Sequence, residues 1–190
     1  MLASLDAVWS VSCFTRKSLS VKKNPLTIAL CSALFAAALP AMAQRTISKP
    51  FGIMVDALIS ESVPVVTCNE LKQMPNAVLF DAREKKEYAV SHLPKARWVG
   101  YDDFALSRVA DVPKTAPIVI YCSVGYRSEK VGEKLKAAGF TNVRNLYGSL
   151  FEWVNQGNPV VDSTGKSTRR VHAYSRTWGI WLKKGEKIYE

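Results

Sequence analysis

The feature that most constrains the fold is a short apolar run that leads into a cysteine and then into a helical pattern. Residues 118–121 are rich in β-branched side chains, which indicates a buried strand. Further on, Val131, Leu135 and Ala138 recur at the spacing of one helical face. We therefore expect Cys122 to lie at the end of a strand, in a tight loop that opens a helix.

A cysteine in such a loop is well placed for chemistry. The first N–H groups of a helix have no intrahelical partner, and together with the helix dipole they favour an anion. A thiol there ionises more easily, and the thiolate is the nucleophile. Gly125 permits turns that are closed to other residues, and Arg127 adds a planar cation that can hold an oxyanion. These two residues favour a catalytic Cys122 over the alternative, an inert cysteine that ends a core strand.

Residues 122–128, which read Cys-Ser-Val-Gly-Tyr-Arg-Ser, resemble the active-site loop of the rhodanese family. Members of this family are sulfurtransferases that carry sulfur as a cysteine persulfide. Their pattern is Cys-Arg-x-Gly-x-Arg, and here a serine replaces the first arginine, which removes one positive charge. The resemblance implies that Cys122 carries the sulfur and that Arg127 holds the donor's oxyanion. It also implies that the donor and the persulfide are bound by the rest of the loop, namely Ser123, Val124, Gly125, Tyr126 and Ser128.

Two other segments resemble the same family. The family has a strand that ends in Asp-x-Arg, and here a predicted strand over residues 77–81 ends in Asp81 and is followed closely by Arg83. The family also has a Gly-His-Ile-Pro-x-Ala segment, and residues 91–96 read Ser-His-Leu-Pro-Lys-Ala. We expect Asp81, Arg83 and His92 to support the structure by tying loops together through hydrogen bonds and ion pairs.

Alternating strands and helices predict an α/β fold, a rhodanese-like domain with a central parallel sheet flanked by helices. Ligand sites in such sheets lie at the carboxyl ends of the strands, where Cys122 falls. We expect a lead-in segment over residues 44–64 that contains a helix, the domain over residues 65–162, and a C-terminal extension over residues 163–190. Within the domain the pattern predicts strands at 65–66, 77–81, 118–121 and 143–146, and helices at 67–73, 85–90, 129–138 and 148–156.

The N-terminal segment, residues 1–43, has the pattern of a secretory signal peptide. A pair of lysines precedes an apolar run over residues 26–39 and an Ala-x-Ala site that ends at Ala43. The run is shorter than the roughly 20 residues that span a bilayer, which disfavours a transmembrane anchor. We expect cleavage near Ala43 and a periplasmic or secreted protein. Because signal peptides usually start close to their positive charges, we also hypothesise that translation begins near Val21.

The C-terminal extension is basic and aromatic, in a chain whose formal net charge is +10. Its aromatic residues argue against simple disorder and are expected to pack on the domain. Contact with an acidic protein or an anionic membrane surface is the alternative, whereas nucleic acid is not an expected partner. The four cysteines match no zinc or haem pattern, and His172 is expected to be structural. We therefore expect no metal and no cofactor.

The sequence favours an enzyme that takes sulfane sulfur from a small anionic donor such as thiosulfate and passes it to a thiol or cyanide. The sequence is also compatible with other classes of protein. Cysteine phosphatases and arsenate reductases have similar loops, but the phosphatase signature has one more residue between its cysteine and its arginine than Cys122 and Arg127 have here. A non-catalytic binding module is another alternative, and so is a redox sensor in which Cys122 oxidises or pairs with Cys68.

Overall fold

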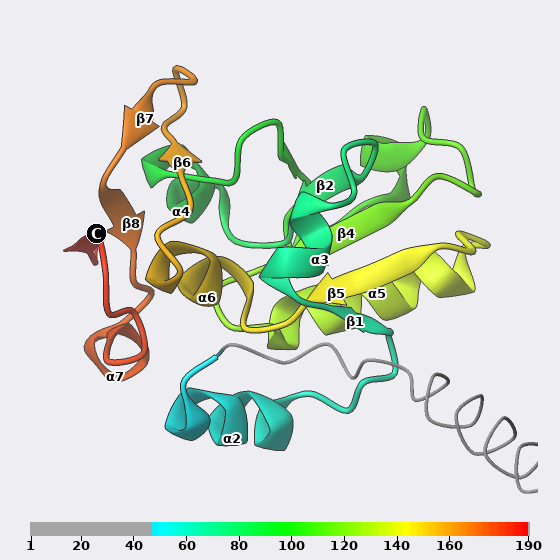
Figure 1. The fold of residues 1–190 in the computed structure, drawn as a ribbon. Coiled ribbons are helices and arrows are strands. Elements are labelled where there is room, and N and C mark those ends of the chain that lie inside the picture. Colours follow the sequence, from blue (N-terminus) through cyan, green and yellow to red (C-terminus); the bar gives the residue numbers. More distant parts are fainter. Residues whose placement is uncertain (1–46, 190) are drawn as a thin grey trace, which may run out of the picture. The chain divides into compact units, whose positions relative to one another are not determined.

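A five-stranded parallel sheet forms the centre of the protein (Figure 1). The computed structural model describes residues 47–189. The strands lie in the order β1-β5-β4-β2-β3, and each hydrogen-bonded pair is parallel, so the expected α/β class is confirmed. Their bounds are β1 (Val65–Val66), β2 (Val78–Asp81), β3 (Arg97–Trp98), β4 (Ile118–Tyr121) and β5 (Val143–Leu146).

The predicted signal peptide and the hypothetical start near Val21 lie outside the described residues. Within residues 47–189, no helix has the length and apolar character needed to cross a bilayer.

The helices largely follow the sequence pattern. Their bounds are α2 (Lys49–Leu58), α3 (Cys68–Lys72), α4 (Lys85–Val90), the 3-10 helix η1 (Leu106–Val109), α5 (Tyr126–Ala137), α6 (Ser149–Asn155) and α7 (Arg176–Gly179). At the start of α3 the hydroxyl of Thr67 accepts a hydrogen bond from the Glu70 amide, and the Glu70 carboxylate accepts one from the Thr67 amide. Helix α5 begins at Tyr126, earlier than its apolar pattern predicts, so Arg127 and Ser128 belong to its first turn.

Strand β4 is buried on both faces, and its side chains enter two different apolar clusters. Ile118 and Ile120 pack in the cluster that includes Val131 and Leu135 of α5. Val119 and Tyr121 pack on the opposite side, in a cluster with residues of α2, α6 and the C-terminal extension. The strand that ends at Cys122 is thus fixed from both sides, and so is the position of the loop that follows.

The C-terminal extension folds into elements that the sequence pattern did not predict. Its strand β7 (Ser167–Thr168) pairs antiparallel with β6 (Val160–Val161) at the end of the expected domain, and its strand β8 (Arg170–His172) pairs in parallel with β9 (Glu186–Ile188). In Figure 1 this orange-to-red part of the chain lies beside α4, and β8 is in contact with α4.

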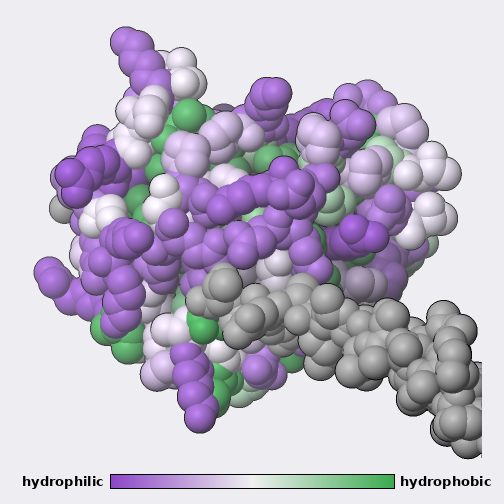
Figure 2. Space-filling view, in the orientation of Figure 1, coloured by the Kyte–Doolittle hydropathy of each residue, from purple (hydrophilic) through white to green (hydrophobic). Residues whose placement is uncertain are grey.

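Apolar residues anchor the extension to the rest of the molecule. Leu182 is fully buried in the same cluster as Phe51 of α2, and the Phe51 ring stacks on Trp181 with ring centroids 5.5 Å apart. Trp178 also packs against this cluster, so the expected packing of the aromatic residues is confirmed for the two tryptophans. Tyr189 stays 37% exposed. The face shown in Figure 2 is mostly hydrophilic, with small and scattered hydrophobic patches.

Candidate active site

Cys122 follows directly on β4, and its side chain is almost completely buried at the start of the loop that leads into α5. The amide of Gly125 donates a hydrogen bond to Cys122 Sγ at 3.1 Å. Gly125 has a φ of +131°, a backbone conformation that L side chains rarely adopt. Its freedom to turn lets the loop bring an amide back onto the sulfur, just before the positive end of the helix dipole.

The surroundings of Cys122 favour its thiolate. Burial alone would raise the pKa of this thiol, but the charge of Arg127 and hydrogen bonds from Ser128 and Gly125 outweigh it, and the pKa lies below its usual value. Cys68 is the opposite case, because burial and the nearby Glu152 raise its pKa to about 12. Both cysteines are free thiols in the structure. Of the two, Cys122 has the electrostatics of a nucleophile.

Arg127 has a partner that the sequence did not reveal. Its Nη1 and Nη2 donate to the two carboxylate oxygens of Glu87 at 2.6 and 2.9 Å, and its Nη2 also reaches Ser123 Oγ at 3.1 Å. The hydroxyl of Ser123 donates to Glu87 at 3.2 Å. Glu87 comes from α4 and is fully buried. Burial raises the pKa of this carboxyl group, but Arg127, with smaller contributions from Arg83 and the Glu84 amide, lowers it more, so the pair is ionic and the charge of Arg127 is balanced.

Three buried polar side chains hold the cysteine loop from inside. The hydroxyl of Ser128 donates to Asn145 Oδ1 at 2.7 Å, and Asn145 Nδ2 donates to the carbonyl of Gly125 at 2.9 Å. Ser149 Oγ accepts a hydrogen bond from the Cys122 amide at 3.1 Å. Ser128, predicted as a substrate contact, is therefore occupied inside the protein, and neither it nor Gly125 lines the pocket described below.

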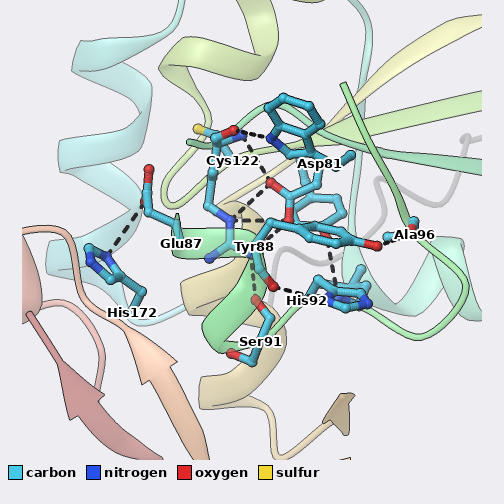
Figure 3. Close-up of polar contacts among 12 residues, drawn as sticks. Asp81, Glu87, Tyr88, Ser91, His92, Ala96, Cys122 and His172 are labelled. Atoms are coloured by element: carbon cyan, nitrogen blue, oxygen red, sulfur yellow. Dashed lines mark hydrogen bonds and ion pairs between the residues drawn. The ribbon is translucent and has the colours of Figure 1, made fainter. Parts of the chain in front are cut away.

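Asp81, Arg83 and His92 make the kind of contacts expected of structural residues, and Figure 3 labels Asp81 and His92 among their neighbours. Arg83 is fully buried, binds the Asp81 carboxylate through Nε and Nη2, and donates from Nη2 to the carbonyl of Ser91 at 2.6 Å. The ring of His92 stacks on Tyr88 with centroids 3.8 Å apart. These contacts join the end of β2 to the turn after α4, and they contribute no group to the pocket beside Cys122.

A pocket of about 130 Å³ opens beside Cys122. Four of the predicted substrate-binding residues line it, namely Ser123, Val124, Tyr126 and Arg127. Three further lining residues were not predicted: Leu58 from α2, and Tyr174 and Trp178 from the C-terminal extension.

His172 does not line the pocket but contacts Tyr174, which does. It is buried, its Nδ1 accepts a hydrogen bond from the Tyr174 amide at 3.2 Å, and the same atom lies 3.9 Å from Glu87 Oε1 (Figure 3). Burial lowers its pKa more than Glu87 raises it, which favours the neutral ring. Among residues 47–189 there is no group of three His, Cys, Asp or Glu side chains placed to hold a metal ion.

Comparisons with known proteins agree on a family. Residues 67–156 match the family described as "Rhodanese-like domain". The chain is 31% identical over 103 residues to the thiosulfate:glutathione sulfurtransferase of Saccharomyces cerevisiae, covering 48% of this chain and 74% of that protein. It is 30% identical over 112 residues to a sulfurtransferase of Allochromatium vinosum, covering 59% of this chain and all of that protein.

Among solved structures, the thiosulfate sulfurtransferase of Pseudomonas aeruginosa is similar with a TM-score of 0.51 and 21% identity. The match covers 72% of this chain and 27% of that one. At this identity the likeness concerns the fold alone.

Proposed function

Because this chain belongs to the family of rhodanese-like domains, we propose that it is a sulfurtransferase that carries sulfane sulfur on Cys122. Both of the relatives described above are named for sulfur transfer, which supports this class of reaction. The observation that carries the finer proposal is the state of Cys122: its sulfur accepts the Gly125 amide, its pKa is lowered, and it borders an open pocket.

The reaction would proceed in two displacements. The Cys122 thiolate attacks the outer sulfur of a donor such as thiosulfate; a new S–S bond forms, the old one breaks, and sulfite leaves with its electron pair. An acceptor, a thiol or cyanide, then attacks the outer sulfur of the persulfide and releases the thiolate of Cys122. The Gly125 amide and the N-terminus of α5 would stabilise the negative charge on sulfur in the free Cys122 thiolate and in the persulfide.

The proposal is tested by intact mass spectrometry of the protein before and after incubation with a sulfane-sulfur donor. We expect the wild type to gain the mass of one sulfur atom and Cys122→Ser to gain none and transfer none. Cys68→Ser is the matched control and should behave as the wild type, because the raised pKa of Cys68 keeps it a thiol. A sulfur gain that persists in Cys122→Ser, or hydrolysis of an aryl phosphate without sulfur transfer, would contradict the assignment.

A further inference from the structure

Three of the residues that line the pocket beside Cys122 lie outside the family match at residues 67–156 and form part of its walls. Leu58 comes from α2, and Tyr174 and Trp178 come from the C-terminal extension. Both segments are firmly attached, since Phe51 stacks on Trp181 and Trp178 packs against the larger apolar cluster. These walls are therefore a built part of the site.

The side-chain charge of Arg127 in this pocket is balanced by Glu87 before any ligand binds. Of the described residues that line it, Arg127 alone carries a permanent charge, and both of its terminal nitrogens already bind Glu87. Ser123 stands where a second arginine is usual in the pattern that the loop resembles. The loop amides and the N-terminus of α5 favour one negative charge, but no unpaired cationic side chain lines the described pocket to balance the second charge of a dianion such as thiosulfate.

The size and lining of the pocket suit one small apolar group. Its volume of about 130 Å³ is close to the cavity of about 150 Å³ that admits a benzene ring in another protein. Leu58, Val124, Tyr126, Tyr174 and Trp178 supply aliphatic and aromatic surface. Aromatic rings bind other rings in stacked or edge-to-face arrangements as well as by burial of area.

Tyr174, which lines one side of the pocket, has a backbone conformation that is unfavourable for its residue type. Its φ is +63°, in the left-handed region that a bulky residue rarely adopts. Its amide is fixed by His172, and its ring lies against Arg127, with the guanidinium carbon 5.1 Å from the ring centroid. Residues held in such conformations cluster at ligand sites. The strained backbone thus places an aromatic ring at the edge of the pocket.

We propose that α2 and the C-terminal extension adapt this site to an organic sulfane-sulfur donor with one apolar substituent, in preference to inorganic thiosulfate. The inference rests on the sulfurtransferase function proposed above. With a thiosulfonate, R–SO₂–S⁻, the Cys122 thiolate attacks the terminal sulfur. The new S–S bond forms on Cys122, the bond to the sulfonyl sulfur breaks, and its electron pair leaves with the sulfinate R–SO₂⁻. The R group lies against Leu58, Tyr174 and Trp178.

The test compares kcat/KM for sodium benzenethiosulfonate and sodium methanethiosulfonate, with cyanide as the acceptor and inorganic thiosulfate alongside. Both organic donors are monoanions that release a sulfinate, and they differ by the ring. We expect the wild type to prefer the benzene compound by about tenfold or more over each of the others. Trp178→Ala and Tyr174→Gly should bring the benzene-to-methane ratio down to about twofold. Because each variant is compared with the wild type, the intrinsic difference between the two leaving groups cancels.

Control variants distinguish a local effect on the pocket from a general loss of stability. Tyr174→Gly removes the ring while relieving the strained φ, and Tyr174→Phe should keep the preference because it keeps the ring. Ile180→Ala changes a residue of the same segment that is 53% exposed and should leave the ratio unchanged.

Two kinds of failure are distinguishable. A wild-type ratio near one, a preference for thiosulfate, or a ratio that survives Trp178→Ala and Tyr174→Gly would overturn this inference while leaving the sulfurtransferase intact. If no donor places a sulfur on Cys122 by intact mass, the proposed function fails, and this inference fails with it.

Discussion

At the scale of single residues, the two cysteines of the described chain have opposite surroundings. Cys68 opens α3 and is buried beside Glu152, which keeps it protonated. Cys122 is buried as deeply, yet Arg127 and the Gly125 amide favour its ionised form. Burial therefore does not decide reactivity in this protein; the groups that face each sulfur do.

This contrast predicts the pH dependence of alkylation. Because the pKa of Cys122 is lowered, its rate of reaction with iodoacetamide should reach half of its maximum at a lower pH than the rate of an ordinary cysteine thiol, measured on a small unstructured peptide. The rate is measured at each cysteine by mass spectrometry of the peptides, and Cys68 should stay unreactive over the same range because its pKa is about 12. A midpoint for Cys122 above that of an ordinary thiol would contradict the structure.

At the scale of elements, Glu87 joins α4 to the first turn of α5. Sequence reasoning missed it, because a glutamate in the first turn of a short helix reads as an ordinary capping residue on a solvated face. Its carboxylate does accept the Glu84 amide, but its main partner is Arg127, distant in sequence. No local pattern predicts that contact. Strand β4 and the capping box of α3, by contrast, were predictable because their signals are local.

Replacing Glu87 by Gln should therefore lower the free energy of unfolding by about 3 kcal/mol, because a nearly buried Arg127 loses its counter-charge. The pair also sets a pH dependence. The pKa of Glu87 is lowered in the folded state, so its contribution is present above the unfolded carboxyl pKa and is lost as the pH falls through the folded pKa. Urea denaturation at several pH values measures both effects.

The matched control for this variant is the exposed pair of Arg97 and Asp111, whose two hydrogen bonds are both 2.8 Å long. Asp111→Asn should destabilise the protein much less than Glu87→Gln does, since solvent screens this pair. Equal costs for Asp111→Asn and Glu87→Gln would show that burial of the Glu87 pair has no energetic consequence.

At the scale of the whole molecule, segments from both sides of the family match share one apolar cluster. Phe51 and Val55 from α2, and Val171 and Leu182 from the C-terminal extension, pack there with residues of the sheet. The sequence indicated that the tail's aromatic residues pack, but it did not show where. Tyr174 lies in a bend after β8 and Trp178 in the four-residue helix α7; both segments are too short to carry a periodic signal, so the place of these residues depends on tertiary contacts.

If the extension is part of this cooperative core, then Leu182→Ala should lower the free energy of unfolding by about 3 kcal/mol, as for other fully buried leucines. Leu106→Ala, at a leucine that is 47% exposed, is the control and should change it by less than about 0.5 kcal/mol. Urea denaturation should give a single transition for both. An unchanged midpoint for Leu182→Ala would mean that the extension folds separately from the domain.

The wall formed by Tyr174 and Trp178 also has a consequence for the order of events during translation. The ribosome makes Cys122 well before it makes the segment that encloses the pocket. A nascent chain can thus form β4, α5 and the thiolate loop while one side of the site is still open to any electrophile. Selectivity among sulfur compounds would then be acquired later than reactivity, once the last part of the chain has docked.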